Sequence, residues 1–123
     1  MKQITKKISH SESTTQIACV KWFRMQYKDY AKLLFAIPNG RVRDIKTGRW
    51  LKLEGVVSGV PDLMLAVPKG KYASLFIEMK SFTGRQTDAQ KEMEGWLTLY
   101  GNKYVICRSF NEFKSCIENY LQA

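Results

Sequence analysis

The stretch GVPDLMLAVPKGKYASLFIEMK, residues 59–80, predicts two short strands joined by a tight turn. The apolar run Leu63–Val67 forms the first strand, and Ala73–Lys80 forms the second. Between them, Pro68–Lys71 contains the proline and glycine that are typical of turns. We therefore expect an antiparallel hairpin at the centre of the molecule, with the rest of the chain built around it.

The hairpin brings acidic and basic side chains together at one end. Asp62 stands at the start of the first strand, while Glu78 and Lys80 occupy alternate positions at the end of the second and so share one face. Two carboxylates with an ammonium nearby suit a divalent cation and a phosphodiester. The oxygens bind the ion, and the ammonium orients water or offsets the developing charge. These residues are our first candidates for a catalytic site.

A structural explanation of the same residues stays open. A Pro-Asp pair often begins a turn, and a Glu and a Lys two positions apart on a strand often form an exposed ion pair. The run Leu75–Ile77 is typical of a central strand, however. Charged residues that close such a strand are costly to bury unless they pair or bind a ligand, and this favours the catalytic interpretation.

The composition predicts one globular domain that binds a polyanion. The chain has 123 residues, 45% of them hydrophobic, which suits a single domain over residues 1–123 with a modest core. The polar residues 1–10 are expected to form a flexible arm. With 20 basic and 11 acidic residues the net charge is +9, so nucleic acid is the expected partner.

Several classes of protein are excluded by what the sequence lacks. His10 is the only histidine, which argues against a catalytic triad, and there is no glycine-rich loop for a nucleotide cofactor. Cys19, Cys107 and Cys116 are too scattered for a zinc site or a disulfide framework, so we expect reduced core thiols. No run is apolar enough to span a membrane and no signal-peptide core precedes the domain, so we expect a cytoplasmic protein without a membrane partner.

Residues 11–32 predict a helix with distinct faces. Its expected core face contains Ile17, Val20, Phe23 and Tyr27. A basic row, which is either a phosphate-binding surface or simply a solvated one, contains Lys21, Arg24, Lys28 and Lys32. Glu12 and Gln16 share a further face, so that Glu12 either approaches the metal site with Gln16 as its support or stabilises the helix N-terminus.

A strongly basic segment follows the strand predicted at Leu33–Ile37 and is the best candidate for binding DNA. Its cations are Arg41, Arg43, Lys46, Arg49 and Lys52. Apolar residues between them would suit one side of a helix, although Thr47-Gly48 would weaken it. We expect Trp50 to be a core anchor, and the alternative is that it stacks on an exposed base.

The C-terminal part of the chain predicts a helix, a strand and a helix. Thr87 and Gln90 fit a capping box that opens a helix over Asp88–Tyr100, with Gly101 as its C-cap. The core face of this helix is expected to contain Met93, Trp96, Leu97 and Tyr100. A strand at Lys103–Arg108 and a second capping box, Ser109 to Glu112, precede the last helix. Its inward residues are expected to be Phe110, Phe113, Ile117, Tyr120 and Leu121.

This order of elements predicts an α/β domain in which helices flank a small mixed sheet. The chain also contains short motifs in a particular order. They are Ile37-Pro38-Asn39-Gly40, a basic segment, Gly59-Val60-Pro61-Asp62, Glu78-Met79-Lys80 and Thr87 to Gln90. This order resembles the stand-alone VRR-NUC domains, a phage-type, Holliday-junction-resolvase-like branch of the PD-(D/E)XK nucleases. The resemblance covers nearly the whole chain and implies a restriction-endonuclease-like core.

The resemblance also implies roles for particular residues. Asp62 and Glu78 would bind Mg²⁺ or Mn²⁺ together with the main-chain carbonyl of Met79, and Lys80 would be the catalytic lysine. Gln90 matches the glutamine that the family places on the helix after this strand. Glu12 matches the acidic residue near the N-terminus of the family.

The activity implied by the resemblance is a Mg²⁺- or Mn²⁺-dependent DNA endonuclease that leaves 5′-phosphate ends and prefers branched DNA such as Holliday junctions. A homodimer is expected, because a two-fold axis supplies two equivalent active sites for two strands. A flap or nicking nuclease is equally compatible with the residues. A catalytically silent DNA-binding module on the same fold is the alternative from another class, although such a module would gain nothing from acids that repel phosphates.

Overall fold

The computed structural model describes the backbone of residues 2–38 and 45–122, and the side chains of residues 11–38 and 49–122. The elements follow one another in the order α1 (Lys2–Gln26), the 3₁₀ helix η1 (Lys28–Leu33), β1 (Leu34–Ala36), α2 (Ile45–Leu53), β2 (Leu63–Leu65), β3 (Leu75–Met79), α3 (Asp88–Leu99), β4 (Lys103–Cys107) and α4 (Phe110–Leu121). Of the predicted DNA-binding residues, Arg41 and Arg43 lie outside the described part of the chain, as does the side chain of Lys46.

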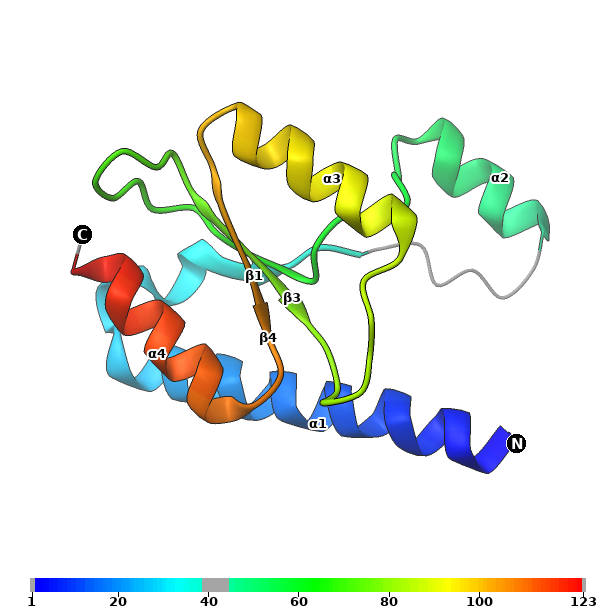
Figure 1. Cartoon of the computed structure of the whole chain (residues 1–123), viewed down its shortest axis with the longest axis horizontal. Coiled ribbons are helices and arrows are strands. Elements are labelled where there is room, and N and C mark those ends of the chain that lie inside the picture. Colours follow the sequence, from blue (N-terminus) through cyan, green and yellow to red (C-terminus); the bar gives the residue numbers. More distant parts are fainter. Residues whose placement is uncertain (1, 39–44, 123) are drawn as a thin grey trace.

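The four strands form one mixed sheet in the order β1-β2-β3-β4. β1 and β2 are antiparallel, as are β2 and β3, whereas β3 and β4 are parallel. The parallel pair requires a long connection, which α3 provides. Figure 1 shows α3 on one side of the strands and both α1 and α4 on the other. The predicted α/β class, a small mixed sheet flanked by helices, is confirmed.

The predicted hairpin is β2 and β3. Leu63 pairs with Ile77 and Leu65 with Leu75. The turn between the strands is narrowed by an isolated bridge from Lys69 to Tyr72, across which both backbone amides donate to the opposite carbonyl. This register leaves Asp62, the residue before β2, next to Glu78 in β3, as the sequence predicts.

The core lies between the sheet and the pair α1 and α4. Leu75, Ile77 and Met79 alternate along β3 and are buried with Phe23 of α1 and Phe113 of α4. At the far end of the sheet, the Tyr120 hydroxyl donates to the carbonyl of Val67 over 2.6 Å. This bond attaches α4 to the strand region. The inward face of α4 agrees with the prediction.

The first helix differs from the prediction at both ends. It begins at Lys2, so residues 2–10, predicted as an arm, are helical, and this segment contains neither Gly nor Pro to stop a helix. It ends at Gln26, because Tyr27 has φ −120° and ψ 71°, and the chain continues as η1. Lys28 and Lys32 therefore lie beyond α1, and the predicted single basic row is interrupted.

The predicted core face of α1 is wrong at Ile17, which is 66% exposed. Cys19 and Phe23, four residues apart, are fully buried instead. Ile17 lies about 120° around the helix from Phe23, since each residue turns an α-helix by about 100°. One apolar residue outside the buried face was thus assigned to it.

Three further aromatic predictions are wrong because the helices that contain these residues are covered on one side only. Trp50, predicted as a core anchor, is 67% exposed on α2, which forms in spite of Gly48. Figure 1 shows α2 beyond the end of α3, away from the strands. On α3, Trp96 and Tyr100 are exposed, while Met93 and Leu97 are half-buried.

The helix caps and thiols also refine the sequence prediction. Thr87 and Gln90 form the complete capping box. Ser109 caps α4, but the Glu112 carboxylate accepts from the Arg108 amide instead of closing the second box. All three cysteines are free, and the Sγ atoms of Cys107 and Cys116 are 3.7 Å apart, a proximity that their spacing in the sequence did not reveal.

Candidate active site

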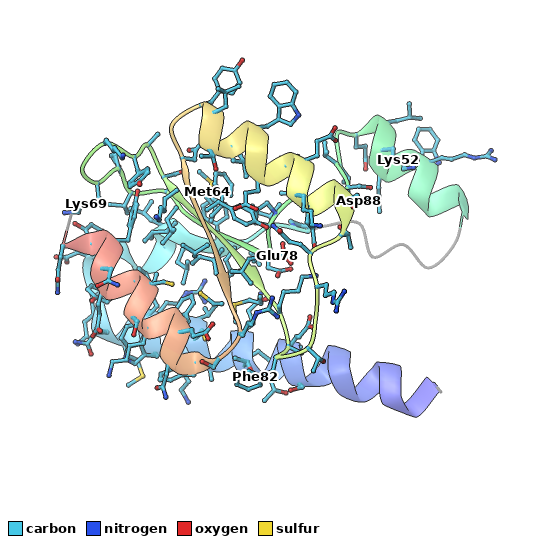
Figure 2. The ribbon with its side chains drawn as sticks, in the orientation of Figure 1. Lys52, Met64, Lys69, Glu78, Phe82 and Asp88 are labelled. Carbon is cyan, nitrogen blue, oxygen red and sulfur yellow. The ribbon has the colours of Figure 1, made fainter. Side chains whose placement is uncertain are left out.

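Two carboxyl groups meet where β2 begins and β3 ends. Oδ2 of Asp62 accepts a hydrogen bond of 2.7 Å from the Met79 amide, so the aspartate is held against the neighbouring strand. The hairpin register places Asp62 opposite Glu78, so the two carboxyl groups influence each other electrostatically. Glu78, labelled in Figure 2, lies inside the molecule between α3 and α1. The sequence prediction that the hairpin brings these acids together is therefore correct.

Glu78 is an acid in an environment that opposes its charge. Its side chain is only 3% exposed. Burial, followed by the negative charge of Asp62 and the hydrogen bond with it, raises the pKa of Glu78 to about 8, although Lys80 acts in the opposite direction. At neutral pH Glu78 is therefore protonated when no cation is bound.

The environment of Glu78 fits a divalent cation. One oxygen, Oε1, is buried and has no hydrogen-bond partner among the described residues. Such an atom is costly to bury unless an ion or a proton neutralises it. Within residues 11–38 and 49–122 no three His, Cys, Asp or Glu side chains converge as a metal site. The Asp62 and Glu78 carboxylates and the Met79 carbonyl are ligand types that suit Mg²⁺, which usually keeps several of its waters.

Gln90 connects α3 to these acids. Its side-chain oxygen accepts from the Thr87 amide and completes the helix cap, while its Nε2 donates to Oε2 of Glu78 over 3.1 Å. The Gln90 side chain therefore caps the helix through its oxygen and contacts Glu78 through its nitrogen, so both roles considered for it are fulfilled. The N-terminus of α3 is fixed relative to β3 as a result.

Glu12 lies in the interior of α1, so the predicted alternative that it stabilises the helix N-terminus is wrong. It lines a cleft of about 200 Å³ together with Gln16 of the same face, the end of β1 and the start of β2. Other residues that line this cleft are Ser13, Ala36, Ile37, Pro38, Asp62 and Met79. Oε2 of Glu12 accepts from the Ser81 amide over 3.2 Å, which ties α1 to the residue after Lys80.

Lys80 leaves β3 at the same end of the sheet. Its amide donates to the Cys107 carbonyl over 3.0 Å, so its backbone remains paired with β4. The loop that follows folds back on itself, since the Gly84 amide donates to both the carbonyl and the hydroxyl of Ser81. The lysine side chain passes this loop, because a Cβ on Gly84 would lie 3.4 Å from Cδ of Lys80.

Arg108 is the site-supporting residue that the sequence did not reveal. Its Nη1 donates to the carbonyls of Ser81 over 2.7 Å and Gly84 over 2.6 Å. The only signal is topological: β4 is parallel to β3 with Cys107 opposite Met79, so Arg108 follows beside Lys80. Two charge-assisted bonds from one guanidinium fix the loop after the catalytic candidate.

The predicted DNA-binding residues are spread over the surface. Lys21, Arg24 and Lys28 are exposed, as are Arg49 and Lys52 on α2. The Arg24 guanidinium donates to the carbonyls of Ala31 and Leu34, so part of its function is to hold η1 and β1 against α1. Lys21 and Arg24 lie roughly 13 and 18 Å along the helix axis from Glu12, at about 1.5 Å per residue. These two residues do not line the cleft beside Glu12.

A mixed sheet with two neighbouring carboxyl groups and a lysine at the end of its central hairpin defines a nuclease-type fold. The chain belongs to the VRR-NUC domain family, a family of nucleases, whose model matches residues 2–111. Among solved structures, a VRR-NUC domain protein is similar, with a TM-score of 0.78 and 25% identity over 90% of this chain and 88% of that chain. No curated protein matches the sequence.

Among the described residues, no helix has both the length and the apolar character needed to cross a membrane.

Proposed function

We propose that this protein is a Mg²⁺- or Mn²⁺-dependent DNA endonuclease that hydrolyses phosphodiester bonds in branched DNA such as Holliday junctions, leaving 5′-phosphate ends. The observation that supports this best is the buried Glu78 carboxyl beside Asp62, with one oxygen that has no partner among the described residues. A DNA-binding surface alone would not need an acid in that position, because it repels phosphate. The net charge of +9 supports a polyanionic substrate.

Each residue of the site has a distinct function in this proposal. Asp62, Glu78 and the Met79 carbonyl would hold the cation, which requires Glu78 to be ionised. When bound, the cation supplies an activated water and neutralises charge on the phosphate. Lys80 orients the attacking water or offsets the charge of the phosphate. Gln90 keeps the Glu78 carboxylate in position, and Glu12 supports the loop after Lys80.

We extend the proposal to the assembly and the place of action. Two symmetrical cuts across a junction require two equivalent sites, which a homodimer with a two-fold axis provides. We also propose a cytoplasmic location, as expected from the sequence. The basic residues on α1, η1 and α2, with Arg41 and Arg43 between β1 and α2, would contact the arms of the junction.

The test is cleavage of end-labelled four-way junction, 5′-flap and linear duplex with Mg²⁺, with Mn²⁺ and with neither. Asp62→Asn keeps an acceptor for the Met79 amide and Lys80→Met keeps the aliphatic stem, so both variants should fold. We expect each to lose cleavage roughly 100-fold or more while DNA binding is retained. Asp29→Asn, an exposed acid on η1, is the matched control and should cut normally.

The substrates distinguish the alternatives. Preference for the junction supports a resolvase, whereas preference for the flap indicates the flap nuclease considered from the sequence. If the wild-type protein binds DNA in a salt-dependent manner but cuts nothing with either metal, the proposal fails and the protein is a binding module. Sedimentation of the wild-type protein with and without junction tests the homodimer directly.

A further inference from the structure

The outer side of α2 presents an aromatic residue among cations. Trp50 is 67% and Leu53 78% exposed, and because they are three residues apart they lie on one side of the helix. Arg49 and Lys52, one position before each, are exposed as well. We call these four residues the α2 face. Large apolar side chains in such a position favour contact with another molecule.

The helix α2, which carries the α2 face, ends in a regular C-terminal capping motif. The Val56 amide donates to the Leu51 carbonyl over 2.9 Å and the Gly55 amide donates to the Lys52 carbonyl over 3.0 Å, the two bonds of a Schellman motif. Gly55 has the positive φ of 106° that this motif requires. Leu51 and Val56 form the half-buried side, so the helix is oriented with Trp50 outward.

The charges around Trp50 differ from those around Trp96, which is also exposed. The sequence of α2 contains Lys46, Arg49 and Lys52 and no acid, although Glu54 follows it. Trp96, which is 54% exposed, lies on α3, whose sequence contains three acids and one lysine. A polyanion would therefore be attracted to Trp50 and repelled from Trp96.

The connections of α2 keep it close to the candidate active site. The chain leaves the cleft at Pro38 and returns to it at Asp62. Leu53 is therefore at most roughly 30 Å from Asp62, the length of nine extended residues. That is less than one turn of B-DNA, about 34 Å. The return path is fixed at Gly59, where a Cβ would lie 2.4 Å from the Ala89 carbonyl oxygen.

We infer that the α2 face binds a base exposed at the branch of branched DNA, with Trp50 stacked on the base and Arg49 and Lys52 on the flanking phosphates. Stacking on an aromatic ring accepts every base, so this contact selects DNA structure and not sequence. Continuous duplex, in which every base is stacked between neighbours, has no free base face to offer. The inference rests on the proposed function, and it names the feature of the substrate that the enzyme detects near the cut.

The experiment measures binding in EDTA, so that it does not depend on cleavage. Three DNAs are compared: a perfect duplex, a duplex with a single-stranded flap, and a four-way junction. Each contains 2-aminopurine, whose fluorescence reports stacking. The probe lies at or next to the branch or, in the perfect duplex, at the matching position of the sequence. We expect Trp50→Ala to weaken binding of flap and junction roughly 5- to 150-fold and to abolish the fluorescence change, with little effect on duplex. Trp50→Phe should restore most of both, and Trp96→Ala should behave as wild type.

Other outcomes overturn the inference. If Trp50→Ala binds all three DNAs as wild type does, or weakens all three equally, Trp50 does not recognise a base exposed at the branch. If the variant changes only the sedimentation of the protein, the α2 face is an interface with a second copy. A wild-type protein that shows the fluorescence change but cuts nothing refutes the proposed function and leaves the binding inference intact.

Discussion

Glu78 makes the stability of the metal-free protein depend on pH. Its pKa is about 8 in the folded protein and 4.5 in the unfolded chain, so the folded state binds more protons between these values. The free energy of unfolding should therefore fall as the pH rises from about 4.5 to about 8. Glu78→Gln, which cannot ionise, should show a weaker pH dependence. Urea unfolding in EDTA at several pH values measures both slopes.

The same experiment with Mg²⁺ tests what replaces the proton. Binding of the cation requires the ionised carboxyl pair, so it should release protons and stabilise the wild-type protein more as the pH rises. Identical pH dependence in wild type and the Gln variant would mean that another group is responsible, and the protonated pair would be refuted.

Arg108 should affect the rate of cleavage more than the binding of DNA. Its contacts with the carbonyls of Ser81 and Gly84 hold the loop that follows Lys80, so we treat it as a positioning residue. We expect Arg108→Met to lower kcat with little change in KM and to reduce the free energy of unfolding by about 2 kcal/mol. Arg108→Lys should recover part of the rate, because one of the two bonds can re-form.

Arg85→Met is the control for Arg108, since it removes the same charge from an exposed position in the loop that Arg108 contacts. If both variants raise KM alike and leave kcat unchanged, Arg108 acts only through its charge. Single-turnover cleavage and chemical unfolding, measured on the same preparations, separate positioning from general loss of stability.

At this scale the sequence predicted the acids better than their support. Asp62 and Glu78 could be located because strand periodicity and a short turn determine which residues meet. Arg108 could not, because its contacts depend on how the loop after Lys80 folds back, which no periodic pattern encodes. Gln90 was found through the capping box, a local motif whose bonds involve residues only three apart.

Among the elements, the approach of α3 to the segment before β2 depends on one glycine. Gly59 has φ +87°, and a Cβ there would lie 2.4 Å from the Ala89 carbonyl oxygen. Gly59→Ala should therefore lower the free energy of unfolding by on the order of 2–3 kcal/mol, since both the left-handed backbone and the backbone contact are unfavourable. It should also slow cleavage, because Gln90 is displaced from Glu78.

Gly95→Ala is the opposite case within α3. Gly95 is exposed, helical and has open space around its missing Cβ. Alanine should stabilise the helix by about 0.5–1 kcal/mol and leave cleavage unchanged. Thermal unfolding of the two variants checks the pair of predictions. Equal and small effects of the two variants would show that the close contact between α3 and Gly59 does not limit stability.

The elements themselves were predictable from periodicity, but their exposed faces were not. An apolar pattern shows that a helix forms, and it does not show whether a neighbour covers it. Ile17, Trp50 and Trp96 were assigned to the core for this reason, and each is more than half exposed. The extent of α1 was missed because the polar residues 2–10 contain no apolar repeat.

For the molecule as a whole, the mixed sheet follows from the hairpin and from one parallel pairing. The sequence predicts β2 and β3 through their short turn, and a strand after a helix favours the parallel addition of β4 beside β3. The placement of β1 at the edge was not predicted. Since the site lies near α1, where β1 and β3 end and β2 begins, the architecture creates the cleft from segments far apart in the chain.

The distribution of the net charge gives a prediction for the whole protein. Counterion release makes the logarithm of the binding constant fall linearly with the logarithm of the salt concentration, by about 0.9 for each phosphate contacted. If the α2 face meets DNA, the double variant Arg49→Gln, Lys52→Gln should reduce that slope by about 2. Fluorescence anisotropy with labelled junction, over a range of salt concentrations, measures the slope.

A second double variant separates local contact from overall charge. Lys71 and Lys103 lie over the ring of Tyr72, 5.5 and 5.4 Å from its centroid, at the end of the sheet opposite the carboxyl pair. Replacing both with Gln lowers the net charge by the same amount as the α2 variant. If DNA binds at the candidate active site, this variant should keep the wild-type slope. Equal slopes in the two variants would mean that the protein attracts DNA only through its net charge and has no defined path for it.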